Sequence, residues 1–255
     1  MNLIDVHAHL DHERFEKDLD LVIARFKEAG GEFIFSSGVD AATNRIVLDL
    51  SKKYDCVKAS FGLYPLDALE RETGNIDFDV DEELSWIEEH KDDCVCIGEI
   101  GMDFNESKEK ALEQEQVFRK VLELAKKIDK TVVIHSRKAE LEVIDIMEDE
   151  GMENVVMHCF CGKKSLIKRC VENGWSFSVP AVIKRWQNFQ MLVEIVPLEQ
   201  LVTETDAPLL SPVIGERNEP SNVTITIGEI AKIKGMDETG VAEQIFKNAK
   251  ELFDL

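Results

Sequence analysis

An eightfold alternation of short apolar runs and amphipathic segments constrains this chain more than any other feature. The apolar runs are rich in β-branched side chains and predict strands at residues 1–10, 33–36, 57–61, 94–99, 131–135, 154–158, 175–179 and 201–206. The segments between them predict helices at 17–29, 41–52, 80–90, 109–128, 138–150, 163–173 and 188–196, and two more helices close the chain. Strands that alternate with helices indicate a parallel sheet, because each helix returns the chain to the start of the next strand.

Eight such units in 255 residues fit one (β/α)8 barrel. No linker, low-complexity tract or change of composition divides the chain, and 44% hydrophobic residues suffice for a large interior. A doubly wound sheet usually has fewer strands and a glycine-rich phosphate loop after the first, and this sequence contains no such motif. We therefore predict a single α/β domain over residues 1–255 with the TIM-barrel architecture.

The balance of charge restricts the partners of the chain. Fifty-one acidic and 30 basic residues give a net charge of −21, which disfavours sequence-independent binding to long DNA or to anionic membranes. A local basic groove stays compatible with this charge. No signal-like segment opens the sequence and no apolar run is long enough to cross a bilayer, so we expect a cytoplasmic protein without a membrane partner.

Six cysteines include two Cys-x-Cys pairs, at 94–96 and 159–161. On a strand this spacing sends the two sulfurs to opposite faces, and structural zinc sites usually use wider spacing. We interpret the cysteines as reduced, mostly buried apolar residues, with a reservation for Cys159 and Cys161 because they directly follow His158.

Side chains able to bind a metal stand at the ends of five predicted strands. They are His7 and His9 in the first strand, Glu99 in the fourth, His135 in the fifth, His158 in the sixth and Asp206 in the eighth. All strands of a barrel end on one face, so these side chains should converge at one mouth. A single histidine there is explained equally well by ordinary hydrogen bonding, but six convergent groups predict a metal centre.

Six ligands exceed the need of one catalytic zinc, which takes three from the protein and keeps a position for water. Two divalent ions fit better, with Glu99 between them, because a carboxylate can bridge two metals and a neutral imidazole cannot. Imidazole and carboxylate ligands together suit zinc, magnesium or manganese, so the identity of the metal stays open.

Seven motifs run through nearly the whole chain: DVHAHLD at 5–11, IGEIGMD at 97–103, IHSR at 134–137, HCFCG at 158–162, ETDAP at 204–208, RNEP at 217–220 and NAKELF at 248–253. Together they resemble the TatD-type metal-dependent deoxyribonucleases, within the wider metal-dependent hydrolase barrels. The resemblance implies that His7, His9, Glu99 and Asp206 hold one metal ion, and that Glu99, His135 and His158 hold the second. This set agrees with the one chosen from the strand ends.

Two segments depart from the family pattern, and both concern substrate contacts. The family usually shows Gly-x-His-Pro after the third strand, where this chain has Tyr64 in place of the histidine. A phenol can donate a hydrogen bond to phosphate but is a poor acid or base near pH 7. Near the seventh strand, 178–180 and 183–185 replace the usual Ser-Gly and Phe-Lys-Asn elements.

The resemblance and the ligand set predict a two-metal hydrolase of phosphodiester bonds, a deoxyribonuclease that acts from the ends of nucleic acid in a 3'-5' exonuclease-like manner. Glu99 and Asp206 are the predicted catalytic residues, with Asp206 placed to accept the proton of water. Glu204 is expected to orient a metal ligand. Arg137, Arg217 and Tyr64 are the predicted substrate contacts, because arginine grips phosphate oxygens bidentately.

Two other functions stay open. An amidohydrolase-type reaction on a small amide, lactone or phosphoester would use the same barrel, although many such enzymes carry a carboxylated lysine where this chain has Glu99. A non-catalytic binding or scaffold protein is the other, and it gives no reason for six convergent metal ligands.

The acidic surface favours a DNA end or short single strand over internal duplex as the substrate. Arg137, Lys163, Lys184 and Arg217 all follow strands, and we expect them to cluster at the mouth. The proline-rich segment 207–222 has no helical or strand periodicity, so we expect it to fold over the mouth with Arg217 toward the substrate.

Overall fold

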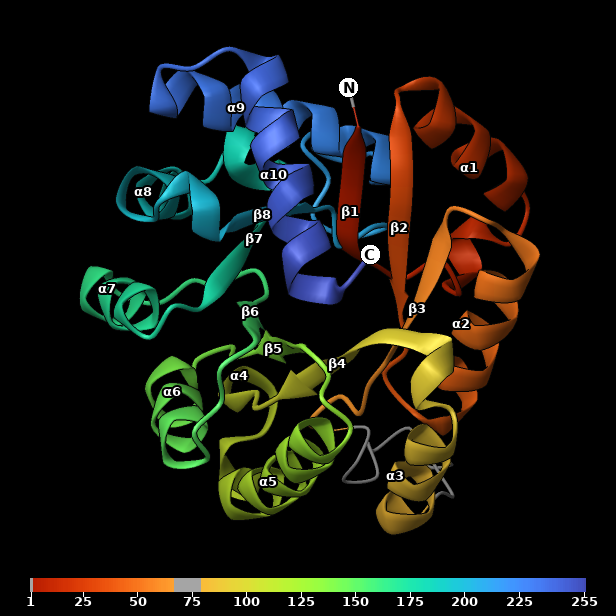
Figure 1. Cartoon of the computed structure of the whole chain (residues 1–255), viewed down its shortest axis with the longest axis vertical. Helices are drawn as coiled ribbons and strands as arrows, with labels where there is room; N and C mark the ends of the chain where they lie inside the picture. Colours follow the sequence, from red (N-terminus) through yellow and green to blue (C-terminus); the bar gives the residue numbers. More distant parts are fainter. Residues whose placement is uncertain (1, 67–78) are drawn as a thin grey trace.

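The computed structural model describes residues 2–66 and 79–255 as one parallel β-sheet surrounded by helices (Figure 1). Within these residues, eight strands have the same order in space as in sequence. They are β1 (Leu3–Ala8), β2 (Gly31–Ser37), β3 (Val57–Phe61), β4 (Cys94–Gly101), β5 (Val132–His135), β6 (Val155–Met157), β7 (Ser176–Pro180) and β8 (Leu201–Glu204). The predicted single-domain (β/α)8 barrel is confirmed. Met1, included in the first predicted strand, lies outside the described residues.

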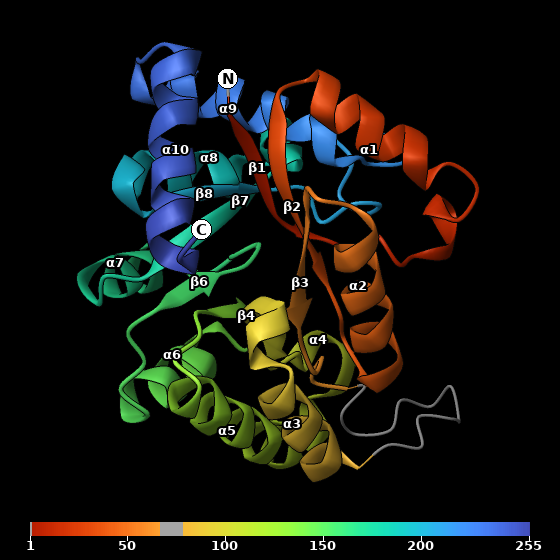
Figure 2. The same ribbon diagram turned by 45° about the vertical axis from the view of Figure 1, so that its right-hand side comes forward.

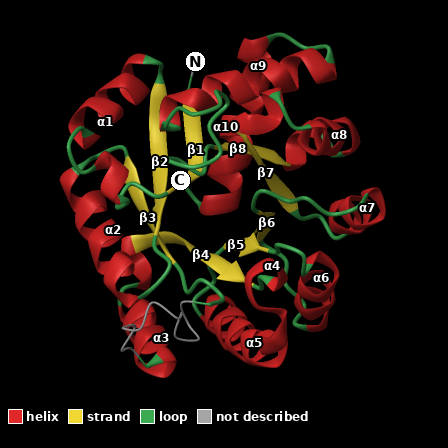
Figure 3. Cartoon of the chain, turned by 180° about the vertical axis from the view of Figure 1, so that it is seen from behind, coloured by secondary structure: helices red, strands yellow, loops and turns green. Residues whose placement is uncertain are grey.

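The helices surround the strands, as the view from behind also shows (Figure 3). They are α1 (Leu19–Glu28), α2 (Ala41–Lys53), α3 (Val80–Glu89), α4 (Phe104–Ser107), α5 (Ala111–Lys127), α6 (Glu140–Asp149), α7 (Lys164–Glu172), α8 (Gln187–Ile195), α9 (Val223–Lys234) and α10 (Glu238–Phe253). Apart from the short α4, which was not predicted, α1 to α8 were predicted to within a few residues at their ends, and α9 and α10 are the two helices expected to close the chain. No helix in the described part of the chain is long and apolar enough to cross a membrane.

The buried side chain of Asp5 accepts hydrogen bonds that join the first strand to the end of the last. Its carboxylate accepts bonds from the backbone nitrogen of Thr205 at 2.9 Å and from the hydroxyl of Thr205 at 2.5 Å. One residue further, the backbone nitrogen of Asp206 donates to the carbonyl of His7 at 2.9 Å. This junction brings the histidines of β1 beside Asp206, which follows β8.

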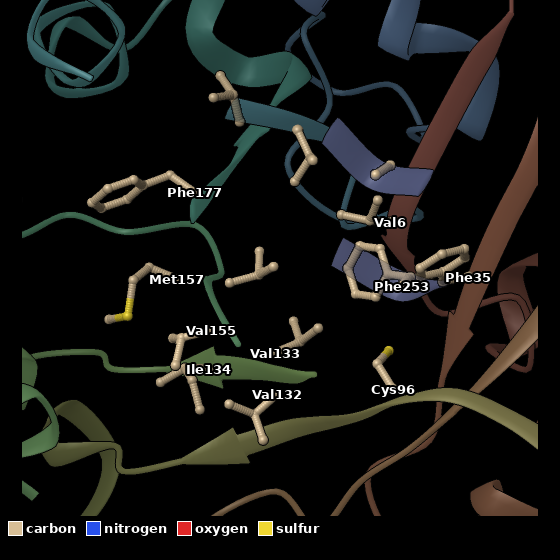
Figure 4. Packing of buried hydrophobic residues seen from close by; sticks show 14 of the residues in the cluster. Val6, Phe35, Cys96, Val132, Val133, Ile134, Val155, Met157, Phe177 and Phe253 are labelled. Atoms are coloured by element: carbon tan, nitrogen blue, oxygen red, sulfur yellow. The ribbon is translucent and has the colours of Figure 1, made fainter. Parts of the chain in front are cut away.

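Buried apolar side chains fill the space between the strands and between strands and helices. Figure 4 labels Val6, Phe35, Cys96, Val132, Val133, Ile134, Val155, Met157, Phe177 and Phe253 in this core. Cys56, Cys94, Cys96 and Cys170 are buried free thiols, which agrees with their interpretation as small apolar residues, whereas Cys161 is exposed.

Helix α10 lies against β1 and β8 (Figure 2). The side-chain amide of Asn248 donates to the carbonyls of Leu198, at 2.7 Å, and of Leu201, the first residue of β8, at 2.8 Å. The ring of Phe253 meets that of Phe35 edge-on, with centroids 4.8 Å apart. The helix therefore packs at the amino-terminal side of the strands, opposite to the end at which His7 and Asp206 meet.

The Asn248 contacts generate a prediction about stability. Asn248→Ala leaves two buried carbonyls without their donor, so the free energy of unfolding should fall by about 1–3 kcal/mol in urea denaturation. Lys247→Ala, on the exposed side of the same helix, is the matched control and should change it by less than about 0.5 kcal/mol. Equal effects of the two substitutions would contradict this role of Asn248.

Candidate metal centre

The structure brings the six predicted ligands together at the carboxyl-terminal ends of the strands. They surround the floor of a cavity of about 530 Å³, which His9, Glu99, His135, His158 and Asp206 line, while His7 is fully buried beneath it. His7 lies in β1 and His9 directly follows this strand, whereas Glu99 lies in β4, two residues before its end. His135 is the last residue of β5, His158 directly follows β6, and Asp206 lies two residues beyond β8.

His7, His9 and Asp206 form the first group. The two Nε2 atoms are 3.3 Å apart, and Asp206 Oδ1 lies 3.7 Å from that of His7 and 3.3 Å from that of His9. Ligands about 2.1 Å from a tetrahedral ion are separated by roughly 3.4 Å, so the three atoms enclose a space of the size of an ion. The residues therefore fit a divalent metal in both chemistry and spacing.

Glu99 lies between the two histidine groups. Its Oε2 is 3.5 Å from His7 Nε2 and 3.8 Å from His9 Nε2, whereas its Oε1 is 2.6 Å from His135 Nδ1 and 3.8 Å from His158 Nε2. One oxygen thus faces each group, as a bridging carboxylate requires. The 2.6 Å contact to His135 is a direct hydrogen bond and is shorter than the roughly 3 Å between neighbouring ligands of one octahedral ion.

The outer ring nitrogen of each histidine contacts a neighbouring side chain or carbonyl. His9 Nδ1 donates to the carbonyl of Ser37 at 3.2 Å, and His7 Nδ1 lies 3.1 Å from the hydroxyl of the same serine. His158 Nδ1 donates to the carboxylate of Glu204, which also accepts the backbone N–H of Cys159 at 3.0 Å. Partners of this kind fix the tautomer and orientation of metal-binding imidazoles, and Glu204 occupies the position expected from the sequence.

Buried acids and histidines shift one another's pKa values. Although burial lowers the pKa of His158, Glu204 and Glu99 raise it to about 10, and Asp206 and Glu99 likewise raise the pKa of His9 to about 9. Burial raises the pKa of Glu99, but His135 and His7 together hold it well below its ordinary value. A cation that binds these imidazoles therefore displaces protons from them.

Asp103 is a site residue that the sequence reasoning missed. Its Oδ2 accepts hydrogen bonds from His135 Nε2 at 2.9 Å and from the hydroxyl of Tyr64 at 2.8 Å, while its Oδ1 caps α4. Asp103 lies within the IGEIGMD motif, two residues beyond β4, so its position among the family motifs was the available signal. Tyr64 lines the cavity, with its hydroxyl bonded to this carboxylate.

Of the four basic residues expected at the mouth, Arg137 alone lines the cavity in the described part of the chain. Lys163, Lys184 and Arg217 do not line it, and the wall instead includes Asp11, Glu106 and Glu140. Among the described side chains on the wall around the six candidate ligands, carboxylates therefore outnumber arginines and lysines.

The segment 207–222 contributes Leu209 and Leu210 to the cavity, but it directs Arg217 elsewhere. The Arg217 guanidinium donates to both oxygens of Asp18, each at 2.7 Å, and to Glu219 at 2.8 Å. Its geometry is that of an anchor between this segment and the residues before α1, and not that of a side chain directed into the cavity.

Known proteins resemble this chain along nearly its whole length. The sequence profile of a family described as "TatD related DNase" matches residues 4–254. The human protein named deoxyribonuclease TATDN3 is 34% identical over 260 residues, covering 99% of this chain and 95% of its own. The Citrobacter koseri protein named 3'-5' ssDNA/RNA exonuclease TatD is 26% identical over 264 residues, covering 99% of both. A solved structure of the Escherichia coli TatD homologue YJJV has a TM-score of 0.90 at 24% identity, covering 99% of this chain and 98% of that one, which shows the same fold.

The position of Glu99 leads to a prediction about metal binding. Glu99→Gln removes the charge that faces both groups, so the metal content per chain should fall. Hydrolysis should drop by more than about 100-fold, because loss of a residue that only bonds to a metal ligand typically costs about 10–100-fold. Elemental analysis after dialysis and a thermal-shift titration with manganese measure this. A variant with unchanged metal content and turnover would contradict a centre built around Glu99.

The two arginines that were predicted to bind substrate should behave differently. Arg217→Ala should lower the melting temperature by roughly 2–4 °C and leave turnover nearly unchanged. Arg137→Ala should lower turnover and leave the melting temperature nearly unchanged.

The stabilising effect of Arg217 should depend on pH. Burial raises the pKa of Glu219, but Arg25 and Arg217 lower it by more, so that it lies below its ordinary value. Its stabilising contribution is therefore present at neutral pH and lost as the pH falls through its folded-state pKa, so the Arg217 effect should shrink below about pH 4. A pH-independent loss of stability would contradict an ion-pair role.

Proposed function

Because the chain belongs to the family of TatD related DNases, we propose that it is a metal-dependent hydrolase that removes nucleotides from the 3' ends of single-stranded nucleic acid. The observation that carries this proposal is the Glu99 carboxylate, one oxygen of which faces His7 and His9 and the other His135 and His158. The name of the Citrobacter koseri relative supports the direction and the single-stranded substrate.

His7, His9, Glu99 and Asp206 would hold one divalent ion, and Glu99, His135 and His158 a second. Zinc, magnesium and manganese are all compatible with imidazole and carboxylate donors. Such ions supply a nucleophilic water at neutral pH and neutralise charge on the phosphoryl oxygens.

The chain's own residues position the reactants. Burial raises the pKa of Asp206, but its bond to His9 and the charge of His158 lower it by more, so that the pKa lies below its ordinary value. The carboxylate is therefore ionised at pH 7 and can accept a proton from the attacking water. Glu204 and Asp103 hold His158 and His135 in place through their outer nitrogens. Arg137 lines the cavity wall, and its guanidinium group can donate two hydrogen bonds to the oxygens of a phosphate.

The shape and charge of the mouth support attack at a strand end. A cavity of about 530 Å³ has the size of small-ligand sites and accepts a terminal nucleotide. Its acidic wall and the net charge of −21 repel a polyanion that would have to lie across it. A single strand that enters end-on brings only a few phosphates near these carboxylates.

A small phosphoester is the second candidate substrate, favoured by the single arginine on the described cavity wall. A non-catalytic role leaves the clustered, mutually oriented ligands unexplained, because burying them is costly without a function.

The proposal predicts a particular pattern of cleavage. With manganese, magnesium or zinc, the protein should shorten a 5'-labelled single strand progressively and leave closed circular duplex intact. Few phosphate contacts imply a shallow dependence of affinity on salt, with a logarithmic slope of roughly −1 to −2. Rapid nicking of the circle would indicate an endonuclease. Absence of cleavage of every nucleic acid, with hydrolysis of a small phosphoester, would favour the second candidate.

A further inference from the structure

Trp186 is an exposed aromatic side chain on the wall of the cavity that contains the metal centre. It is 39% exposed, whereas Trp175 is buried and does not line this cavity. An exposed apolar ring indicates a binding surface where further apolar side chains line the same cavity.

The ring of Trp186 is held in a defined orientation. It lies nearly parallel to the ring of Phe189, with an interplanar angle of 6° and centroids 6.0 Å apart, and Phe189 is fully buried in α8. The backbone nitrogen of Trp186 also donates to the carbonyl of Val182 at 3.1 Å. The aromatic surface is therefore fixed before any ligand arrives, which reduces the entropy lost on binding.

A second segment completes an apolar strip on the cavity wall. Leu209 is 47% exposed and lines the cavity together with Leu210. The Arg185 guanidinium donates to the carbonyl of Ser211 at 2.8 Å, so the segment that carries Trp186 is tied to the segment that carries the two leucines. Trp186, Leu209 and Leu210 thus line the same cavity from two segments that this bond joins.

The remainder of the wall restricts what this surface can bind. Additional negative charge on a ligand is repelled by Asp11, Glu106 and Glu140. One phosphoryl group can be bound by Arg137 and the metal centre. A ligand that matches the cavity therefore carries a phosphate at one end and a flat, apolar, uncharged group beside it. Nucleobases have this character, and they stack on aromatic rings with little dependence on sequence.

We propose that Trp186 is the platform on which a nucleobase next to the scissile phosphate stacks, and that it makes the site specific for nucleotides over base-free phosphodiesters. This inference rests on the proposed nuclease function and adds the recognition of the base to it. Residues 183–185, directly before Trp186, replace the usual family element near the seventh strand.

The first test compares two bases that differ in aromaticity. Single strands ending in thymidine or in 5,6-dihydrothymidine have similar size and hydrogen-bonding groups, but only thymidine has a flat aromatic ring. Wild type should prefer the thymidine end by roughly tenfold in kcat/KM, mostly through KM. Trp186→Ala should abolish the preference and Trp186→Phe should restore most of it. Leu112→Ala, at an exposed leucine outside the cavity, should keep the wild-type preference.

The second test measures binding without catalysis. Thymidine monophosphate should quench the tryptophan fluorescence of the wild type in the presence of metal, and Trp186→Phe should remove most of this quenching, although Trp86 and Trp175 remain. Melting temperatures near that of the wild type verify that the variants fold.

The outcomes separate the inference from the function on which it rests. If the wild type cleaves single strands but Trp186→Ala keeps the full preference for thymidine, the stacking platform is wrong and the nuclease function stands. If the wild type cleaves no nucleic acid, the proposed function fails. Quenching that is equal in the wild type and in Trp186→Phe overturns the platform in either case.

Discussion

The buried cluster of carboxylates and imidazoles around Glu99 is the interaction on which the rest of the structure depends. Four histidines and the acids Glu99, Asp103, Glu204 and Asp206 lie within contact of one another, all largely removed from water. An unpaired charge in such a place would cost several kcal/mol, so each group is tolerated only because its partners are present. The strands must therefore end in register, because a strand displaced by one residue would turn its ligand away from the cluster.

The backbone at these strand ends is adapted to the same requirement. Lys138, Cys159 and Asp206 have positive φ angles of 61°, 45° and 57°, and they lie two or three residues beyond the ends of β5, β6 and β8. Such conformations cost roughly 1–3 kcal/mol each in residues with a Cβ atom and persist where surrounding contacts determine them. For Asp206 the contact is the bond from its backbone nitrogen to the carbonyl of His7. The β1–β8 junction that closes the barrel thus also fixes the turn that presents a ligand.

The sequence was sufficient for the fold and for the convergence of the ligands because both depend on local pattern. Hydrophobic periodicity locates strands and helices, and parallel closure brings every strand end to one face. The choice of partner by a long polar side chain is not local. Arg137 and Arg217 looked alike in sequence, yet Arg217 pairs with Asp18, which lies near the other end of the chain. Tyr64, which follows β3, likewise donates to Asp103, which follows the neighbouring strand β4, a contact that no spacing rule could indicate.

The carboxylates at the mouth restrict how a polyanion could approach the proposed site. At physiological ionic strength charges are screened over about 8 Å, so the surface carboxylates act mainly on phosphates that come close to them. In the proposed mode of binding, a strand end would place one phosphate at the candidate metal centre and its base against Trp186, Leu209 and Leu210, which line the same cavity. An internal segment would have to bring phosphates on both sides past Asp11, Glu106 and Glu140. The proposed selectivity for ends would then follow from where the negative charge lies, without a separate element that blocks the path of the strand.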